Sequence, residues 1–175
     1  MNHPRPARIL PPFQARGSTN CASTTMPRPT SPPSRTLLFI PADRYTPTGD
    51  GTIPTGEILP LKGTLLDFNQ PTRIGDRIEQ LKPTMAGYDH NYILAEDRGL
   101  KLAARLTEPK SGRVMEVRTT QPAIQLYTGN HFAHTAVCLE TQHYPDAIHH
   151  PNFPSIVLRP GAPLHETTVF TFLAN

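Results

Sequence analysis

The stretch VCLETQHYPD, residues 137–146, holds a carboxylate in a pattern that could support acid–base chemistry. If this stretch is a β-strand, alternate side chains point to opposite faces of the sheet. Glu140 then shares one face with Cys138, Gln142 and Tyr144. Glu140 could be a proton acceptor held in a pocket. It could also be an exposed residue of a strand with one solvated face.

Two other groups of polar residues stand among apolar neighbours. The segment GYDHNYIL, residues 87–94, places Asp89 and His90 between tyrosines where a strand is expected to begin. In AIQLYTGN, residues 123–130, Gln125 alternates with apolar residues. The alternatives are a turn aspartate beside a solvated histidine, and an exposed strand glutamine. Spacing alone does not decide between these interpretations and a functional site.

The histidines raise the question of a metal site. A zinc site needs three or four converging ligands, and the chain contains neither CxxC nor HExxH. The two histidines of HFAH have a helical spacing in a segment that is predicted to be a turn between strands. We therefore expect no metal, and the absence of GxSxG and of a glycine-rich phosphate loop argues against two further site types. Six histidines fall in the last third of the chain: His131, His134, His143, His149, His150 and His165.

Short strands separated by Gly/Pro turns must position these residues. The segment KLAARL, residues 101–106, alternates, with Leu102, Ala104 and Leu106 predicted on one face and Ala103 on the other. Residues 71–81 are predicted to contain one short helix with Thr72 as its cap. The pattern indicates an all-β sandwich or barrel. The further strands are expected at residues 36–42, 114–120, 124–130, 136–142 and 167–174, with a hairpin turn at 108–113.

Composition limits the classes of function. The net charge of +3 arises in residues 1–42, which contain five arginines and no acidic residue, whereas the remainder has 12 basic and 14 acidic residues. The body of the chain therefore does not resemble a nucleic-acid-binding surface. No apolar run approaches the roughly 18 residues of a membrane helix, and no secretory signal is evident. A single domain without a membrane partner is expected from 175 residues.

The first 35 residues differ from the rest. They contain eight prolines and few aliphatic residues, so we expect a disordered segment before a domain at residues 36–175. A transit peptide and a proline-rich ligand motif are weaker alternatives. Cys21 and Cys138 are the only cysteines, so a disulfide framework is not expected. A reducing, cytoplasmic setting is the expectation.

Five segments carry a resemblance to a known family. They are PADRYTPTGDGTIPTGE, GYDHNYIL, AARLTEPKSGRVMEVRTTQPAIQLYTGN, CLETQHYPDAIHHPNFPSIVLRPG and TTVFTF, in this order between about residues 37 and 175. Together they resemble the C-terminal half of the galactose mutarotase, or aldose 1-epimerase, family. The resemblance implies an antiparallel β-supersandwich, truncated to its C-terminal half, with an open sugar-binding cleft.

The resemblance also implies a reaction, the interconversion of the α and β anomers of free aldohexoses such as galactose and glucose. A glutamate takes the proton of the C1 hydroxyl, a histidine protonates the ring oxygen, and the opened sugar rotates before it closes. The family needs no metal or organic cofactor. By motif, the glutamate falls on Glu140, while Asp89 and Gln125 fall on residues that bind sugar hydroxyls.

Two departures from the family pattern affect the expected activity. The family's acid histidine lies in an N-terminal half that this sequence does not match, and the loop at residues 131–137 is shorter than usual. We therefore expect a weak or inactive epimerase, with a non-catalytic carbohydrate-binding remnant or a non-functional fragment as alternatives. Uncovered sheet faces and unpaired edges predict self-association.

Overall fold

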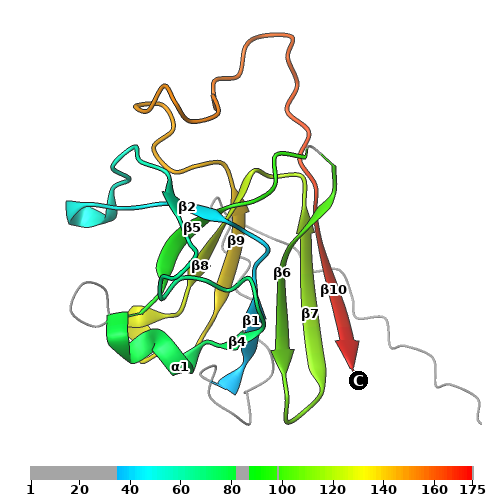
Figure 1. Ribbon diagram of the computed structural model, residues 1–175. Coiled ribbons are helices and arrows are strands. Elements are labelled where there is room, and N and C mark those ends of the chain that lie inside the picture. Colours follow the sequence, from blue (N-terminus) through cyan, green and yellow to red (C-terminus); the bar gives the residue numbers. More distant parts are fainter. Residues whose placement is uncertain (1–34, 82–86, 98, 175) are drawn as a thin grey trace, which may run out of the picture.

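Two five-stranded antiparallel sheets form the body of the molecule (Figure 1). The computed structural model describes residues 35–81, 87–97 and 99–174, so the predicted disorder of the first 35 residues lies almost entirely outside the described residues. One sheet has the order β10-β7-β6-β1-β4 and the other β3-β2-β5-β8-β9. The strands are β1 (Leu37–Phe39), β2 (Arg44–Thr46), β3 (Leu59–Pro60), β4 (Thr72–Arg73), β5 (Asp89–Ile93), β6 (Lys101–Glu108), β7 (Arg113–Thr119), β8 (Ala123–Tyr127), β9 (Cys138–Gln142) and β10 (Thr168–Ala174). The predicted all-β class is confirmed.

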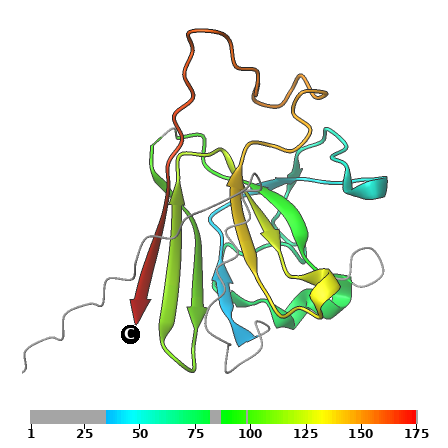
Figure 2. The same ribbon diagram turned by 180° about the vertical axis from the view of Figure 1, so that it is seen from behind.

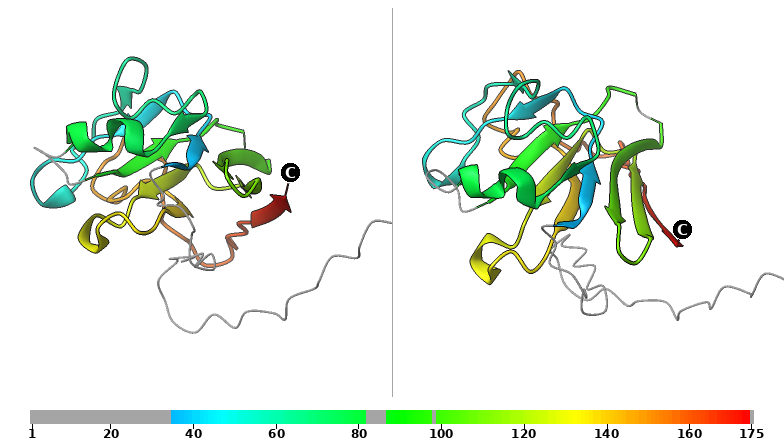
Figure 3. Two further views of the ribbon diagram at one scale, coloured as in Figure 1. Left: turned by 90° about the horizontal axis from the view of Figure 1, so that it is seen from below. Right: turned by 60° about the horizontal axis from the view of Figure 1, so that its bottom comes forward.

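The main core lies between the two sheets, which Figure 3 shows end-on. Strands of both sheets turn apolar side chains inward, because alternate residues face opposite sides. Leu38 and Val117 come from the first sheet, and Tyr92 and Leu126 from the second; all four are fully buried. The hydroxyl of Tyr92 remains satisfied because it donates to the carbonyl of Leu66 at 3.0 Å.

The hairpin of β6 and β7 follows the predicted turn, but one residue breaks the predicted alternation. A register shift lies between Leu102 and Ala104. Ala103 is the extra residue of this bulge, so Ala103 and Ala104 are both fully buried. Strict alternation places Ala103 and Ala104 on opposite faces, but the bulge leaves both of them buried. Small side chains at both positions allow the strand to bend against the core.

The predicted short helix is present, but its predicted cap is wrong. α1 (Gly75–Ile78) continues into the 3₁₀ helix η3 (Glu79–Leu81). Ile74 occupies the cap position without a side-chain hydrogen bond, while Thr72 lies in β4 opposite Leu38 of β1. Thr72 and Arg73 pair with β1, and this pairing gives Thr72 an extended backbone conformation instead of the cap position.

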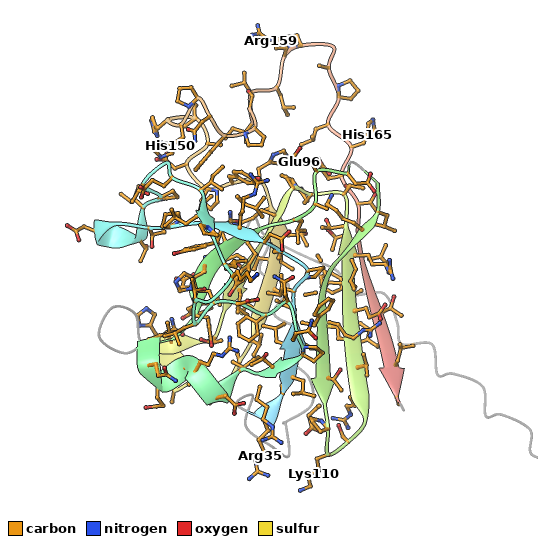
Figure 4. The ribbon with its side chains drawn as sticks, viewed as in Figure 1. Arg35, Glu96, Lys110, His150, Arg159 and His165 are labelled. Atoms are coloured by element: carbon orange, nitrogen blue, oxygen red, sulfur yellow. The ribbon has the colours of Figure 1, made fainter. Side chains whose placement is uncertain are left out.

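A long segment between β9 and β10 extends beyond the sheets (Figure 2). Its first part packs on a small second core, in which Tyr144 and Phe153 contact Ile93 and Ala123. His150 lies at the base of this segment, where its Nε2 is 3.2 Å from the carbonyl oxygen of Pro54 (Figure 4). Arg159 lies at the far tip of this segment, and His165 lies where the segment returns toward β10 (Figure 4). Among the described residues, no helix is long and apolar enough to cross a membrane.

Candidate functional site

Three adjacent strands, β5, β8 and β9, bring the predicted site residues together on the outer face of their sheet. Asn91 pairs with Gln125 across β5 and β8, and Gln125 pairs with Glu140 across β8 and β9. Asp89 precedes Asn91 by two residues and therefore points to the same face. Neighbouring strands lie about 4.8 Å apart, so these polar side chains form a contiguous row.

A depression of about 440 Å³ opens over this row. Its floor comes from β5, β8 and β9, and one wall comes from β2 and the turn that follows it. The described lining residues are Thr46, Thr48, Thr52, Pro54, Asp89, Asn91, Gln125, Tyr127, His131, Glu140, Gln142 and Pro145. The structure thus places Asp89, Gln125 and Glu140, which the sequence analysis singled out on three separate segments, in one depression.

A chain of side-chain hydrogen bonds runs along the floor of the depression. Gln125 Nε2 donates to Asp89 Oδ1 at 2.7 Å. Gln142 Nε2 donates to Gln125 Oε1 at 3.2 Å and to Asn91 Oδ1 at 3.1 Å. Asn91 Nδ2 in turn donates to Thr46 Oγ1 at 3.1 Å. These bonds hold three carboxamides and a carboxylate in defined orientations.

Glu140 stands apart from this chain of hydrogen bonds. Its side chain is half-buried and lines the depression. Within the described residues it forms no hydrogen bond and no ion pair. A carboxylate that is not engaged by the protein keeps its lone pairs available to a ligand, either as hydrogen-bond acceptors or as a proton acceptor. The carboxylate of Asp89, in contrast, already accepts a bond from Gln125.

His90 lies on the opposite face of β5 and does not reach the depression. Its ring makes edge contacts with Tyr45 and Tyr88, at centroid distances of 6.3 and 6.5 Å, and its Nδ1 accepts the backbone N–H of Asp89. Desolvation lowers the pKa of His90 to about 4, although the nearby charge of Asp89 acts in the other direction. His90 is therefore a neutral structural histidine near pH 7, which excludes it as a substitute acid in this depression.

His131 is the one histidine among the described residues that lines the depression. It is exposed and lies in the 3₁₀ helix η4 (Asn130–Phe132), between β8 and β9. Other histidines contact groups elsewhere: His143 Nε2 lies 3.8 Å from Glu166 Oε1, and His149 contacts Asp146. The described part of the chain contains no group of three metal-ligating side chains.

The comparison with protein families decides the assignment of this fold and site. The model of the aldose 1-epimerase family matches residues 33–171. The chain belongs to the aldose 1-epimerase family. The match spans all the strands that build the depression.

Curated relatives of this aldose 1-epimerase family member are longer than the chain itself. Galactose mutarotase of Rattus norvegicus is 41% identical over 148 residues, which cover 77% of this chain and 43% of that protein. Galactose mutarotase of Homo sapiens is 40% identical over the same length. Aldose 1-epimerase of Escherichia coli (strain K12) is 31% identical over 155 residues, or 45% of its length. The chain thus spans less than half the length of these relatives.

Solved structures of the family share the fold. A GalM/aldose epimerase homologue from C. elegans aligns with a TM-score of 0.71 at 22% identity, over 82% of this chain and 47% of that one. Galactose 1-epimerase from Lactobacillus acidophilus NCFM aligns with a TM-score of 0.63 at 26% identity, over 82% of this chain and 45% of that one. Both alignments place the two sheets of this chain within the aldose epimerase fold.

Part of the lining of the depression was not expected from the sequence. Asn91 and Thr46 were not singled out, although both line the depression and both are buried. Strand alternation contained a signal for Asn91, which stands two residues after Asp89. Thr46 had no such signal, because its place beside Asn91 depends on the pairing of β2 with β5.

Proposed function

We propose that this chain carries the sugar-binding and proton-accepting part of an aldose 1-epimerase site, which acts on free aldohexoses such as galactose and glucose. The observation that carries the proposal is the row of Asp89, Gln125 and Glu140 on three paired strands, in one depression of a family member. The chain covers less than half of its curated relatives, so activity is proposed here from the site and the family.

The chemistry of the depression suits a sugar. A hexose presents neighbouring hydroxyl groups that each donate and accept hydrogen bonds. Carboxylates accept such bonds and carboxamides do both. Asp89 and Gln125 would bind hydroxyls from fixed positions because they are already bonded to each other. The volume of about 440 Å³ falls within the range of about 300–1,000 Å³ common for small-molecule sites.

Glu140 would act as the base of ring opening. Its free carboxylate takes the proton of the C1 hydroxyl, the O–H electron pair forms the C1 carbonyl, and the bond from C1 to the ring oxygen breaks. The ring oxygen takes a proton from a solvent water molecule, and the aldehyde rotates about C1–C2. In the reverse steps the ring oxygen returns its proton to solvent and Glu140 returns its proton to the C1 oxygen, which gives the other anomer. One positioned proton-transfer group contributes roughly 10²- to 10⁴-fold.

A second candidate function is sugar binding without efficient catalysis. His131, the one described histidine in the depression, is exposed and has no hydrogen-bond partner among the described residues. A proton donor that nothing orients contributes little, because catalysis depends on a defined geometry. This observation favours slow anomerisation over a fast rate.

Polarimetry of freshly dissolved α-D-galactose tests catalysis. We expect the optical rotation to reach equilibrium faster with the chain than in buffer, and we expect the Glu140→Gln variant to lose at least about 90% of this acceleration, given the contribution of one proton-transfer group. A matched control, Glu96→Gln, changes an exposed carboxylate outside the depression. A rate equal to that in buffer would leave sugar binding as the function.

We also infer that the chain self-associates when it is made alone. Its edge strand β10 exposes Val169, Phe172 and Leu173, and among the described residues it pairs with β7 alone. Exposed edge strands with apolar side chains are templates for pairing with another chain. A cytoplasmic setting remains part of the proposal.

A further inference from the structure

We propose that Gln142 is a positioning residue, which fixes the orientation of Gln125 and through it that of Asp89. This inference rests on the proposed sugar-binding function. Gln142 stands two residues after Glu140 on β9 and therefore faces the same depression. Its contacts are with the side chains of the row, so its effect on a sugar would pass through them.

The polarity of the hydrogen bonds requires this role. An ionised Asp89 carboxylate can only accept, so Gln125 must turn its Nε2 toward Asp89. The Oε1 of Gln125 then faces Gln142 and needs a donor there. Gln142 Nε2 supplies one, and it uses its second hydrogen on Asn91 Oδ1.

The far end of the chain of bonds is anchored in the protein. Asn91 is 3% exposed and Thr46 is 1% exposed. Asn91 Nδ2 donates to Thr46 Oγ1, so the Oδ1 of Asn91 is left to accept from Gln142. Leaving a buried amide oxygen without a donor costs free energy. The Oδ1 of Asn91 therefore favours the orientation of the Gln142 carboxamide in which Nε2 also donates to Gln125.

A free carboxamide at position 125 could present either its oxygen or its nitrogen to a ligand. Asp89 and Gln142 together remove this ambiguity, because Asp89 takes one hydrogen of Gln125 Nε2 and Gln142 donates to Gln125 Oε1, which leaves the second Nε2 hydrogen for the ligand. Fixed orientation lowers the entropy that a bound sugar must otherwise overcome. Gln142 thus specifies which hydrogen-bond donors and acceptors the floor of the depression offers.

The variants Gln142→Glu and Gln142→Leu test the inference in ¹⁵N-labelled protein titrated with D-galactose. Both remove the two N–H donors, and the leucine variant adds no charge. We expect the side-chain NH₂ signals of Gln125 to shift in both variants without sugar, and the affinity for galactose to fall about 10-fold or more. Gln80→Glu, which changes an exposed residue of η3, is the charge control and should bind as the wild type does.

The outcomes separate this inference from the proposed function. Unchanged Gln125 signals in both variants, or unchanged galactose affinity in variants that still melt as the wild type does, would overturn the positioning role alone. A wild-type protein that binds no galactose would overturn the proposed function, and the positioning role with it. Shifted Gln125 signals together with weaker binding at an unchanged melting temperature would support the role. A variant that merely lost stability would show a lower melting temperature as well as a lower affinity for galactose.

Discussion

Consecutive residues of β5 face opposite environments. Asp89 and Asn91 line the depression, whereas His90 and Tyr92 point toward the rings and carbonyls of the core. Burial raises the pKa of Tyr92 well above 10 and lowers that of His90 to about 4. Both groups are therefore neutral near pH 7, and the charges of this strand are confined to its outer face.

His90 makes the stability of the fold depend on pH. Its pKa is about 4 in the folded chain, whereas the ordinary pKa of a solvated histidine is 6.5. The contribution of neutral His90 to the free energy of unfolding is therefore complete above pH 6.5. It is lost as the pH falls toward 4, because the unfolded chain binds the proton more readily. The loss is on the order of 3 kcal/mol. We expect urea unfolding of His90→Gln to show a shallower fall in free energy between pH 6.5 and 4.

A matched variant controls for the carboxylates that titrate in the same range. His165→Gln changes an exposed histidine on the segment beyond the sheets. Its pH dependence should follow that of the wild type. Equal slopes in the wild type and His90→Gln would show that His90 is not the neutral buried group that we describe.

The element that positions Asp89 depends on a glycine just before β5. Gly87 has a φ of +153°, and a Cβ there would lie 2.3 Å from Asn130 Oδ1. That oxygen accepts the hydroxyl of Thr128 at 2.7 Å, while Asn130 Nδ2 donates to the carbonyl of Tyr88 at 3.2 Å. The start of β5 and the end of β8 are thereby held together beside the depression.

Gly87→Ala should therefore destabilise the fold by about 1–3 kcal/mol, because the new methyl group displaces a hydrogen-bonded amide. Chemical denaturation measures this change. Gly49→Ala is the control, since a Cβ there would meet only Thr55 Cγ2 at 3.6 Å. The control should remain within about 0.5 kcal/mol of the wild type. Equal stability of the two variants would argue against the packing described at Gly87.

Local sequence patterns predicted the elements with long alternating runs better than the short ones. β6, β7, β8 and β9 arise from apolar alternation and a hairpin turn, which are properties of adjacent residues. The bulge at Ala103 and the strand position of Thr72 depend on partners distant in sequence. A propensity for capping at Thr72 is weaker than the pairing of β4 with β1, and local patterns contain no information on that partner.

The same limit applies to the site. Alternation placed Glu140 and Gln142 on one face of a strand, and the family motifs singled out Asp89 and Gln125. The row that these residues form depends on the register of β5 with β8 and of β8 with β9. A shift of one residue in either pairing would turn one strand's polar face toward the core.

At the scale of the whole molecule, β10 contacts both sheets. Thr168 Oγ1 lies 2.9 Å from Thr119 Oγ1 of its own sheet and 2.7 Å from Thr141 Oγ1 of the other. Farther along β10, Phe170 packs on the main core, but Phe172 is 58% exposed. The far end of β10 therefore presents an apolar edge.

Self-association should depend on this edge. We expect the chain made alone to elute as a dimer or larger species at high concentration, and the Phe172→Lys variant to shift toward monomer, because an edge lysine opposes strand pairing. Light scattering on a size-exclusion column measures the mass. Ile148→Lys changes an exposed apolar residue outside β10 and should not alter the mass. A monomeric wild type at every concentration would contradict the expectation.

Both candidate functions require that the outer face of the β5–β8–β9 strands binds a free hexose, and calorimetric titration with D-galactose tests this claim most directly. We expect saturable binding to the wild type and unchanged binding to His165→Asn. Binding to Asp89→Ala should be at least about 10-fold weaker, because an acceptor for a sugar hydroxyl is lost and the Nε2 of Gln125 loses its acceptor. A wild type without saturable heat, or an Asp89→Ala variant that binds as tightly as the wild type, would contradict the account.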